Sequence, residues 1–528
     1  MQFNFSKVLL LTLLFSSFSI IAQDENEPIT KTDPKVSEQK MLSGNYDEAL
    51  DDFLNLHAEE PSNNKYTYNI AVCYLNINGN KAKAVPYLEK LVRHDKHDPN
   101  VEYLLGRAYH YANKFDEAIS YFTKFKTNAK GTQENLKNVD QQMQYCLNAK
   151  ELMKFPADVK FESMGYNVNS EYNEHYSFIP ADESFVVFNT NRPEKNSFKD
   201  ENGEYKNSIY ISEVIDGEYQ KAYLIGAPIC KGNTGEEVIG LSANGKTLLM
   251  LIKDSKGLGN IYISEKDENG TFKKPVMLDK NINSASDEIA ASLSAEGDQI
   301  YFASNRPGGF GGIDLYMSRK QPNGTWSLPN NLGPAINTAL DEDFPNIAPD
   351  GKTLYFSSKG HTSMGGYDIF KANFDEENQK WENAKNIGYP VNTTGDDMNY
   401  RASSNARYGY ISAIRSNGMG DYDIYRVVFN EIDPELTVLK GIILSEDGSA
   451  INYPDVLLSV WDNKTKELVG TYLPNSNTGK YVVILSPGNY LMEVELYGFK
   501  IATRKLEIKD KISYQSEMDL DIKLQVPK

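Results

Sequence analysis

A phrase that recurs five times along the chain constrains its fold more than any other feature. The clearest copy runs from Asp341 to Phe374 and reads DEDFPNIAPDGKTLYFSSKGHTSMGGYDIFKANF. Its Asp350-Gly351 pair predicts a tight turn between antiparallel strands, and its Gly365-Gly366 pair predicts the next turn. A single sheet of this kind cannot bury both of its faces, so we expect the copies to stack around an axis.

The five copies predict a β-propeller over residues 155–432. The steps from Ala243 to Ala295 and from Ala295 to Pro349 are 52 and 54 residues, longer than the blade of about 40–45 residues in WD40 proteins. We predict five blades, with six as the alternative. The first turns of the copies are Ala181-Asp182-Glu183, Ala243-Asn244-Gly245, Ala295-Glu296-Gly297, Pro349-Asp350-Gly351 and Asn405-Ala406-Arg407.

The segment before the first copy resembles a strand that the last copy lacks. Met164–Asn169 matches Leu332–Asn337 in spacing, and copy five ends at Phe429 without such a strand. We therefore expect the N-terminal strand to complete the last blade. This closure would latch the ring and remove its exposed edges.

Residues 34–154 carry a helical pattern with a long period. Ala49, Ala84 and Ala118 follow one another at intervals of 35 and 34 residues, with aromatic residues at matching places between them. Small residues let paired helices approach closely, and aromatic residues fill the space between them. This pattern resembles the tetratricopeptide repeat.

The resemblance to this repeat implies a concave groove that takes a peptide of a partner protein. Tyr68, Tyr103 and Arg107 would lie on that groove. The alternative is that the helices form a spacer that packs on the next domain.

Both ends of the chain carry distinctive segments. Residues 1–22 combine Lys7, an apolar run and a small residue at Ala22, which is typical of a secretory signal peptide. Residues 23–33 are polar and are expected to form a mobile leader. The residue directly after the predicted cleavage site is Gln23 and not a cysteine, so an acylated N-terminus is not expected. Residues 436–528 combine turn signals with alternating strands such as Tyr481–Leu485, and resemble the carboxypeptidase regulatory-like domain, a β-sandwich.

Composition narrows the class of partner. The formal net charge of −18 argues against nucleic acid or an anionic membrane surface. No later run approaches about 18 consecutive apolar residues, so no transmembrane span is predicted. The cysteines, Cys73, Cys146 and Cys230, are too few for a disulfide framework. Cys73 and Cys146 are expected to be buried small residues of helices, with a bridge between them as the alternative.

Motifs for enzymatic chemistry are absent from the sequence. We find no G-x-x-x-x-G-K-[ST], H-E-x-x-H or G-x-S-x-G pattern. No catalytic residue, metal or cofactor is therefore predicted, and the chain is predicted not to be an enzyme. His94 and His97 are interpreted as part of a solvated loop rather than a metal site. Asp314, Asp368 and Asp423 share one position of the repeat and are interpreted as turn caps, with calcium binding as the alternative.

The main candidates for function are acidic pairs at the junctions between copies. Each pair lies on the connection from one blade's outermost strand to the next blade's innermost strand, so all should gather on one face. We expect this face to attract a basic partner segment. The alternative is that each carboxylate satisfies nearby backbone donors. The pairs are Glu236-Glu237, Asp287-Glu288, Asp341-Glu342 and Asp396-Asp397, with Asn173-Glu174 as a neutralised fifth.

The phrase around Asp350 resembles the PD40, or TolB-like, propeller repeat of bacterial periplasmic proteins. Helical repeats, a propeller and a sandwich, in this order behind a signal peptide, describe a multidomain α+β chain that resembles the PorE-like, OmpA-family proteins of Bacteroidota. The resemblance implies a periplasmic location with outer-membrane association, and an envelope complex of type IX secretion or gliding motility as partner. The chain stops at Lys528 without an OmpA-like domain, so direct peptidoglycan binding is not implied.

These observations lead to three competing hypotheses. The leading one is a non-enzymatic periplasmic scaffold that binds protein partners through its repeat groove and propeller face. The first rival is a glycan- or peptide-binding component of an outer-membrane uptake or envelope-maintenance system. The second rival is an enzyme, because propellers also host hydrolases and lyases.

Overall fold

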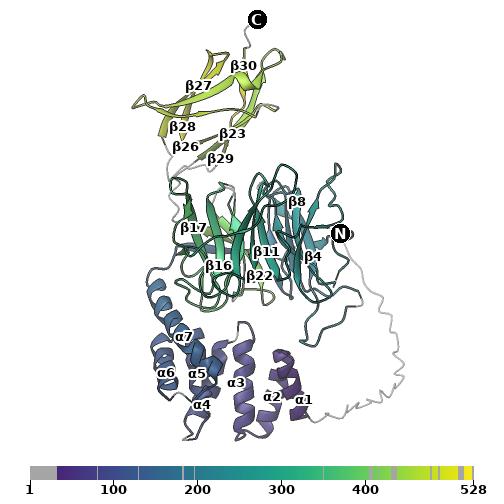
Figure 1. The fold of residues 1–528 in the computed structure, drawn as a ribbon, viewed down its shortest axis with the longest axis vertical. Helices are drawn as coiled ribbons and strands as arrows, with labels where there is room; N and C mark the ends of the chain where they lie inside the picture. Colours follow the sequence, from purple (N-terminus) through teal and green to yellow (C-terminus); the bar gives the residue numbers. More distant parts are fainter. Residues whose placement is uncertain are drawn as a thin grey trace, which may run out of the picture.

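The computed structural model of the chain shows three regions in sequence order (Figure 1). It describes residues 32–525, except 80, 95, 129, 181–182, 196, 233, 349, 404–407, 416, 430–436, 476–477, 486–487 and 509–516. The predicted signal peptide and nearly all of the predicted leader lie outside these residues. A helical region, a propeller and a smaller β region follow one another along the long axis of the molecule.

The helical region packs consecutive helices against one another. Ala49, Ala84 and Ala118 are fully buried between them. A Cβ atom added at Gly106 would lie 2.6 Å from the Phe122 ring, so the absence of a side chain lets two helices approach. The helices are α1 (Pro34–Leu42), α2 (Tyr46–Glu59), α3 (Asn64–Asn76), the short 3₁₀ helix η1 (Lys81–Ala84), α4 (Val85–Val92), α5 (Asn100–Tyr111), α6 (Phe115–Asn128) and α7 (Gln133–Leu152).

The propeller region is built from antiparallel sheets whose second strands are buried almost throughout, because each sheet packs between two neighbours. The strands of each sheet are hydrogen-bonded in the following order. The first sheet contains β2 (Glu174–Phe178), β3 (Phe185–Thr190), β4 (Ser208–Ile215) and β5 (Glu218–Tyr219), with β6 (Tyr223–Leu224) also paired with β4. The second contains β7 (Glu237–Leu241), β8 (Thr247–Lys253), β9 (Gly259–Glu265) and β10 (Val276–Met277), and the third contains β11 (Glu288–Leu293), β12 (Gln299–Ser304), β13 (Asp314–Arg319) and β14 (Asn330–Asn331). The fourth contains β15 (Glu342–Ile347), β16 (Thr353–Ser358), β17 (Asp368–Asp375) and β18 (Lys380–Trp381), with β19 (Lys385–Asn386) also paired with β17. The fifth contains β20 (Met398–Ala402), β21 (Tyr408–Ala413), β22 (Asp423–Phe429) and β1 (Val159–Ser163).

The innermost strands of these sheets form a closed ring. β2 contacts β7 and β20, and the contacts continue from β7 through β11 and β15 to β20. β1 pairs antiparallel with β22, from Val159 opposite Phe429 to Ser163 opposite Tyr425. Closure by an N-terminal strand is thus confirmed, since the first strand of the region completes the sheet formed by the last three. The strand lies at Val159–Ser163, directly before the segment Met164–Asn169 in which it was predicted.

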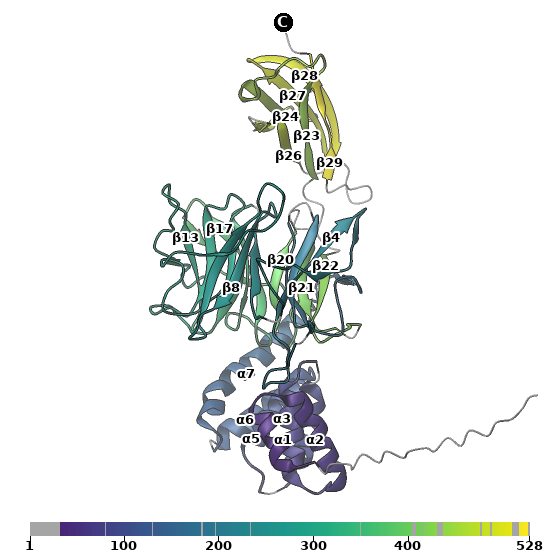
Figure 2. The same ribbon diagram turned by 90° about the vertical axis from the view of Figure 1, so that its right-hand side faces the viewer.

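The C-terminal β region consists of two sheets with a common core. Tyr481, Val483 and Leu485 alternate with exposed residues along one strand and face that core. This region lies on the side of the propeller opposite the helices (Figure 1, Figure 2). One sheet contains β23 (Thr437–Ser445), β26 (Lys480–Leu485), β29 (Glu517–Asp519) and β30 (Ile522–Leu524), and the other contains β24 (Val456–Asp462), β25 (Leu468–Tyr472), β27 (Gly488–Leu496) and β28 (Phe499–Ile508).

Among the described residues no helix has the length and apolar character needed to cross a membrane. Cys73, Cys146 and Cys230 are free and buried. The interpretation of Cys73 and Cys146 as buried small residues is confirmed, and the alternative of a bridge between them is wrong.

Candidate functional site

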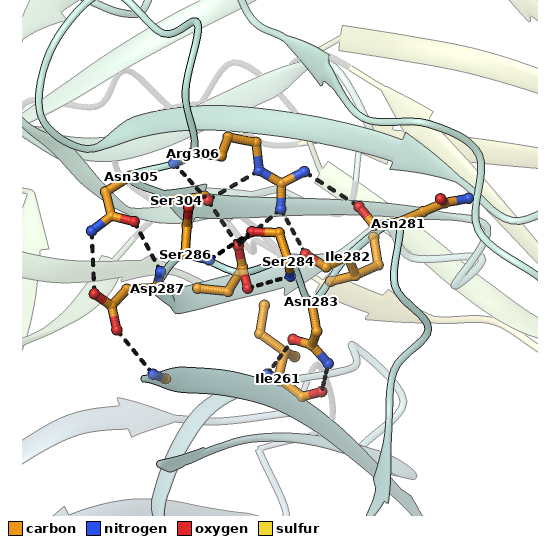
Figure 3. A network of polar contacts seen from close by, with 12 residues as sticks. Ile261, Asn281, Ile282, Asn283, Ser284, Ser286, Asp287, Ser304, Asn305 and Arg306 are labelled. Atoms are coloured by element: carbon orange, nitrogen blue, oxygen red, sulfur yellow. Dashed lines mark hydrogen bonds and ion pairs between the residues drawn. The ribbon is translucent and has the colours of Figure 1, made fainter. Parts of the chain in front are cut away.

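The second residue of most acidic pairs is buried in a local hydrogen-bond network. Glu288 accepts hydrogen bonds from the backbone and hydroxyl of Ser284 at 2.9 and 2.8 Å and from Ser304 Oγ at 2.9 Å. Arg306 Nη2 donates to the same carboxylate at 3.0 Å. Figure 3 shows this network, in which Ser284, Ser304 and Arg306 lie close together. The carboxylate therefore fastens the connection that precedes its own strand.

The same arrangement recurs in three other sheets. Glu174 binds Ser170, Thr190 and Arg192; Glu342 binds Thr338 and Ser358; and Asp397 binds Thr393. Glu288, Glu342 and Asp397 are at most 4% exposed. Their expected place on an acidic binding face is therefore wrong, since burial in these networks leaves no surface for a partner. The alternative, capping of nearby donors, is confirmed for these three residues.

The first residues of the pairs are half-buried and join neighbouring sheets. Asp287 accepts from the Gly259 backbone at 3.0 Å, Asp341 accepts from the Ile313 backbone at 3.1 Å, and Asp396 accepts from the Tyr367 backbone at 2.9 Å. Gly259 begins β9, and Ile313 and Tyr367 directly precede β13 and β17, which are the third strands of their sheets. Asp341 also binds Lys359 Nζ at 2.9 Å. These carboxylates are part of the scaffold of the ring.

Glu236-Glu237 departs from this pattern. Glu237 is half-buried, and its Oε1 accepts from Asn207 Nδ2 at 2.8 Å. The residue four positions before it is an asparagine, whereas the other pairs have a serine or threonine there. Both side chains line a cavity of about 720 Å³ that opens at the end of the ring nearest the helices. The cavity also has Asn78, which follows the end of α3, in its wall.

The cavity is lined by more acidic than basic side chains. Its carboxylates are Asp200, Glu204, Glu236 and Glu237, and its cations are Lys206 and Lys253. Burial and the neighbouring charges of Asp47 and Asp421 raise the pKa of Glu204. Burial also lowers the pKa of His175 in the wall, so its imidazole adds no compensating charge. The remaining lining residues are mostly polar or aromatic and include Asn173, Tyr176, Asn191, Tyr205, Asn207 and Tyr422.

Sequence analysis missed Asp200 and Glu204. Both lie on the connection between β3 and β4, residues 191–207, which is longer than residues 305–313 at the same place in the β12 sheet. This connection reaches the helices, where Ser43 Oγ donates to the Glu201 carbonyl at 3.1 Å. The insertion in the first copy was a sequence signal that could have identified this segment.

The residues predicted for the repeat groove do not form an open groove. Tyr103 is 5% exposed and packs against Phe122 and Phe125. Tyr103 and Arg107 line a cavity of about 260 Å³ whose opposite wall includes Gly365-Gly366 of the propeller. Tyr68 packs on the helical core and does not line that cavity. The predicted groove position of Tyr103 is wrong, because its ring fills space between helices.

The helices are docked on the propeller by buried hydrogen bonds. His110 Nε2 donates to the Met364 carbonyl at 2.8 Å, and Met364 itself is fully buried in the helical core. Tyr145 OH donates to the Lys359 carbonyl at 2.7 Å, and Asn148 Nδ2 donates to the Ser363 carbonyl at 2.8 Å. The alternative in which the helices pack on the next domain is confirmed by these contacts.

Two further sets of residues act locally. Asp314, Asp368 and Asp423 each accept backbone N–H groups of the preceding glycine-rich turn, as predicted for turn caps. His97 Nδ1 lies 2.8 Å from the His94 carbonyl. Among the described residues no group of three or more His, Cys, Asp or Glu is arranged to hold a metal ion.

Comparison with known families identifies the helical region. Residues 67–96 and 103–134 match two models of the tetratricopeptide repeat. The chain therefore contains tetratricopeptide repeats. A comparison with curated proteins found no match.

Solved structures similar to this chain include TolB proteins and structures named as enzymes. TolB from Acinetobacter baumannii has 12% identity and a TM-score of 0.30, over 56% of this chain and 70% of that one. A periplasmic gluconolactonase from Pseudomonas aeruginosa has 11% identity and a TM-score of 0.29, over 66% and 98%. A glycoside hydrolase has 8% identity and a TM-score of 0.35, over 53% and 94%.

These structures correct one prediction from the sequence. The chain was predicted not to be an enzyme, yet structures named as a gluconolactonase and a glycoside hydrolase are among those similar to it. The lack of catalytic motifs therefore does not exclude catalysis, since one propeller fold hosts many activities. At TM-scores below 0.5 the similarity assigns no activity to this chain.

Proposed function

We propose that the chain is a scaffold that binds a protein partner through the cavity between its helices and its propeller. The observation that carries this proposal is the convergence of four carboxylates and two lysines around an opening of about 720 Å³. A cavity with a surplus of negative charge favours a lysine- or arginine-rich segment. Asn78, which lies in one of the matched tetratricopeptide repeats, adds to the wall of the cavity, and repeats of this kind commonly bind protein segments.

The electrostatics of the wall support a cationic ligand. The pKa values of Glu204 and Asp421 are both raised by burial and by the charge of Asp47. Burial is the larger cause of both shifts, and repulsion between ionised carboxylates adds to it. A bound cationic side chain would relieve that repulsion, and it would do so most strongly where water is excluded.

The cellular setting forms a second part of the proposal. We infer a periplasmic protein associated with the outer membrane, acting with an envelope complex of type IX secretion or gliding motility. The order of helical repeats, propeller and C-terminal β region supports this inference through its resemblance to PorE-like proteins. In the same comparison the ring of five sheets corresponds to a five-bladed propeller, and residues 436–528 to a carboxypeptidase regulatory-like sandwich.

Affinity purification from native envelopes tests the proposal. The full chain is compared with a Glu236→Gln/Glu237→Gln variant in 50 mM and 300 mM salt. A matched control, Glu376→Gln/Glu377→Gln, removes the same charge from an exposed turn outside the cavity. We expect the cavity variant to recover less partner than the wild type, and the difference to be larger in low salt because screening weakens charge attraction.

Equal recovery by the wild type and both variants would contradict a role for the cavity. The identity of the recovered proteins tests the setting separately. Secretion or motility components support the proposed complex, whereas glycan-uptake proteins support the rival function.

The rival function, binding of a glycan, is favoured by one observation. Tyr176, Tyr205 and Tyr422 share the cavity with the amide side chains of Asn173 and Asn207. Aromatic rings and amides are suited to the apolar faces and hydroxyl groups of sugars. A glycan ligand would show little dependence on salt, which separates it from the basic segment in the same experiment.

A further inference from the structure

The ring has a second opening, on the side away from the helices. Each innermost strand contributes one side chain to the wall of this opening. In every strand this side chain lies four positions after the acidic residue described above, so the five side chains form one layer around the axis. A cavity of about 60 Å³ lies within this opening. The five residues are Phe178, Leu241, Ser292, Asn346 and Arg401, of which Arg401 alone is charged.

Arg401 presents an unused pair of donors. Its Nη1 donates to the Pro345 carbonyl at 2.8 Å. Its Nε and Nη2 have no hydrogen-bond partner among the described residues, although the side chain is only 6% exposed. These two nitrogens point to the same side of a guanidinium group and form the fork that binds a carboxylate through both oxygens. The Phe178 ring lies 4.4 Å from the guanidinium carbon and restricts its orientation.

Other arginines of the propeller show what the fork normally binds. Arg426 directs Nε and Nη2 to Glu162, Arg192 directs Nε to Glu174, and Arg306 directs Nη2 to Glu288. In the part of the chain that the structure describes, Arg401 has no carboxylate within ion-pair distance. A buried cation without a partner is strongly unfavourable, because it has lost its hydration without gaining a counter-charge.

The groups around the opening restrict the ligand further. Glu183 also lines it, but its carboxylate accepts the hydroxyl hydrogen of Tyr408. Burial lowers the pKa of Arg401, and the nearby negative charge of Asp343 opposes this shift without forming an ion pair. One water molecule needs a cavity volume of about 10–15 Å³. The cavity of about 60 Å³ therefore has room for a few water molecules or one small group. It does not have room for a sugar ring or a peptide segment.

We propose that this opening is a binding site for a single carboxylate group, held by Nε and Nη2 of Arg401. The carboxylate belongs either to a small free acid or to an acidic side chain of a polypeptide, because either can place one planar anion in the opening. This site is separate from the cavity next to the helices. It favours an anionic group, whereas that cavity favours a cationic one.

Thermal unfolding of the full chain in acetate and in chloride tests the site, at the same pH and ionic strength. A ligand that binds the folded protein alone raises Tm. We expect 200 mM acetate to raise the Tm of the wild type by about 2 °C relative to chloride. Arg401→Met should abolish this difference, whatever its own Tm. Arg426→Met is the matched control and should keep the difference, because the fork of Arg426 is already occupied by Glu162.

The remaining outcomes decide the proposal. Equal Tm values in acetate and chloride, or the same acetate effect in all three proteins, would overturn it and leave only water in the opening. An effect of sulfate that requires Arg401, without one of acetate, would overturn the carboxylate assignment. A capped Ala-Glu-Ala peptide, compared with its Gln counterpart, separates the two sources. Stabilisation by the Glu peptide at a lower concentration than acetate supports a polypeptide ligand, and stabilisation by acetate alone supports a free acid.

Discussion

Arg426 Nε donates a hydrogen bond to Glu162 Oε2 at 2.9 Å, and 264 residues separate the two in sequence. They are register partners in β22 and β1. The pair therefore joins the two ends of the propeller in one sheet. A ring closed in this way has no free sheet edge at its junction.

We predict that the strand contributes much more stability than the ion pair. Glu162→Gln removes a partly exposed pair and should lower the unfolding free energy by less than about 1 kcal/mol. Deletion of residues 158–170 exposes the edge of β22 and should lower the Tm of the propeller by several degrees. Thermal unfolding followed by circular dichroism measures both, and an unchanged Tm after the deletion would contradict the latch.

The stability of the propeller should fall as the pH rises from 5 to 8 because of Glu342. Burial raises its pKa to about 7 from 4.5. In the sheet of Glu288, Arg306 lies beside the buried carboxylate and donates to the Ile282 carbonyl. In the sheet of Glu342, His361 takes this place and donates to the Ile336 carbonyl, so Glu342 has no arginine beside it. The folded protein binds this proton more tightly than the unfolded chain. Its stabilising effect is complete below pH 4.5 and is lost as the pH rises through about 7.

Glu342→Gln isolates this effect, because the other titrating groups are common to both proteins. We expect its stability relative to the wild type to improve by about 2 kcal/mol between pH 5 and pH 8. Urea denaturation at the two pH values measures the change. Glu288→Gln, the equivalent substitution beside Arg306, should be destabilising at both pH values because it removes an ion pair. A pH-independent difference between Glu342→Gln and the wild type would contradict the raised pKa.

Gly311→Ala should destabilise the ring by overpacking. A Cβ atom at this position would lie 1.8 Å from the Leu340 carbonyl oxygen, on the connection to the next sheet. We expect a loss of about 1–3 kcal/mol in the unfolding free energy. Gly297→Asn is the control, because nothing lies within 4 Å of that position and asparagine tolerates its positive φ of 69°. Equal effects of the two changes would show that close packing between sheets is not the cause.

Tyr145→Phe should weaken the docking of the helices without disturbing their fold. The substitution removes the hydroxyl that donates to the Lys359 carbonyl and keeps the ring. We expect a loss of about 1 kcal/mol and faster hydrogen exchange in residues 359–364. Tyr166→Phe changes a tyrosine that is 87% exposed and should alter neither measurement. Unchanged exchange in Tyr145→Phe would mean that the remaining contacts fix the interface alone.

The sequence was informative where its signal repeats. The spacing of Ala49, Ala84 and Ala118 predicted helical repeats, because every repeat needs a small residue at the same packing position. The match of Met164–Asn169 with Leu332–Asn337 predicted closure by an N-terminal strand for the same reason, although the strand itself, Val159–Ser163, directly precedes the matched segment. The acidic pairs were also detected by repetition, and most of them proved to be scaffold, since a residue that every sheet needs usually serves the sheet.

Non-repeating features depended on the tertiary structure. The sequence by itself determined the helical repeats, the propeller and the position of its closing strand, through periodic patterns that report local packing. Only the tertiary structure decided that Glu288, Glu342 and Asp397 are buried, that Asp200 and Glu204 join Glu236-Glu237 around one cavity, and that Nε and Nη2 of Arg401 have no hydrogen-bond partner among the described residues. The reason is physical: burial and charge balance depend on residues brought together from distant parts of the chain, and no local pattern records these contacts.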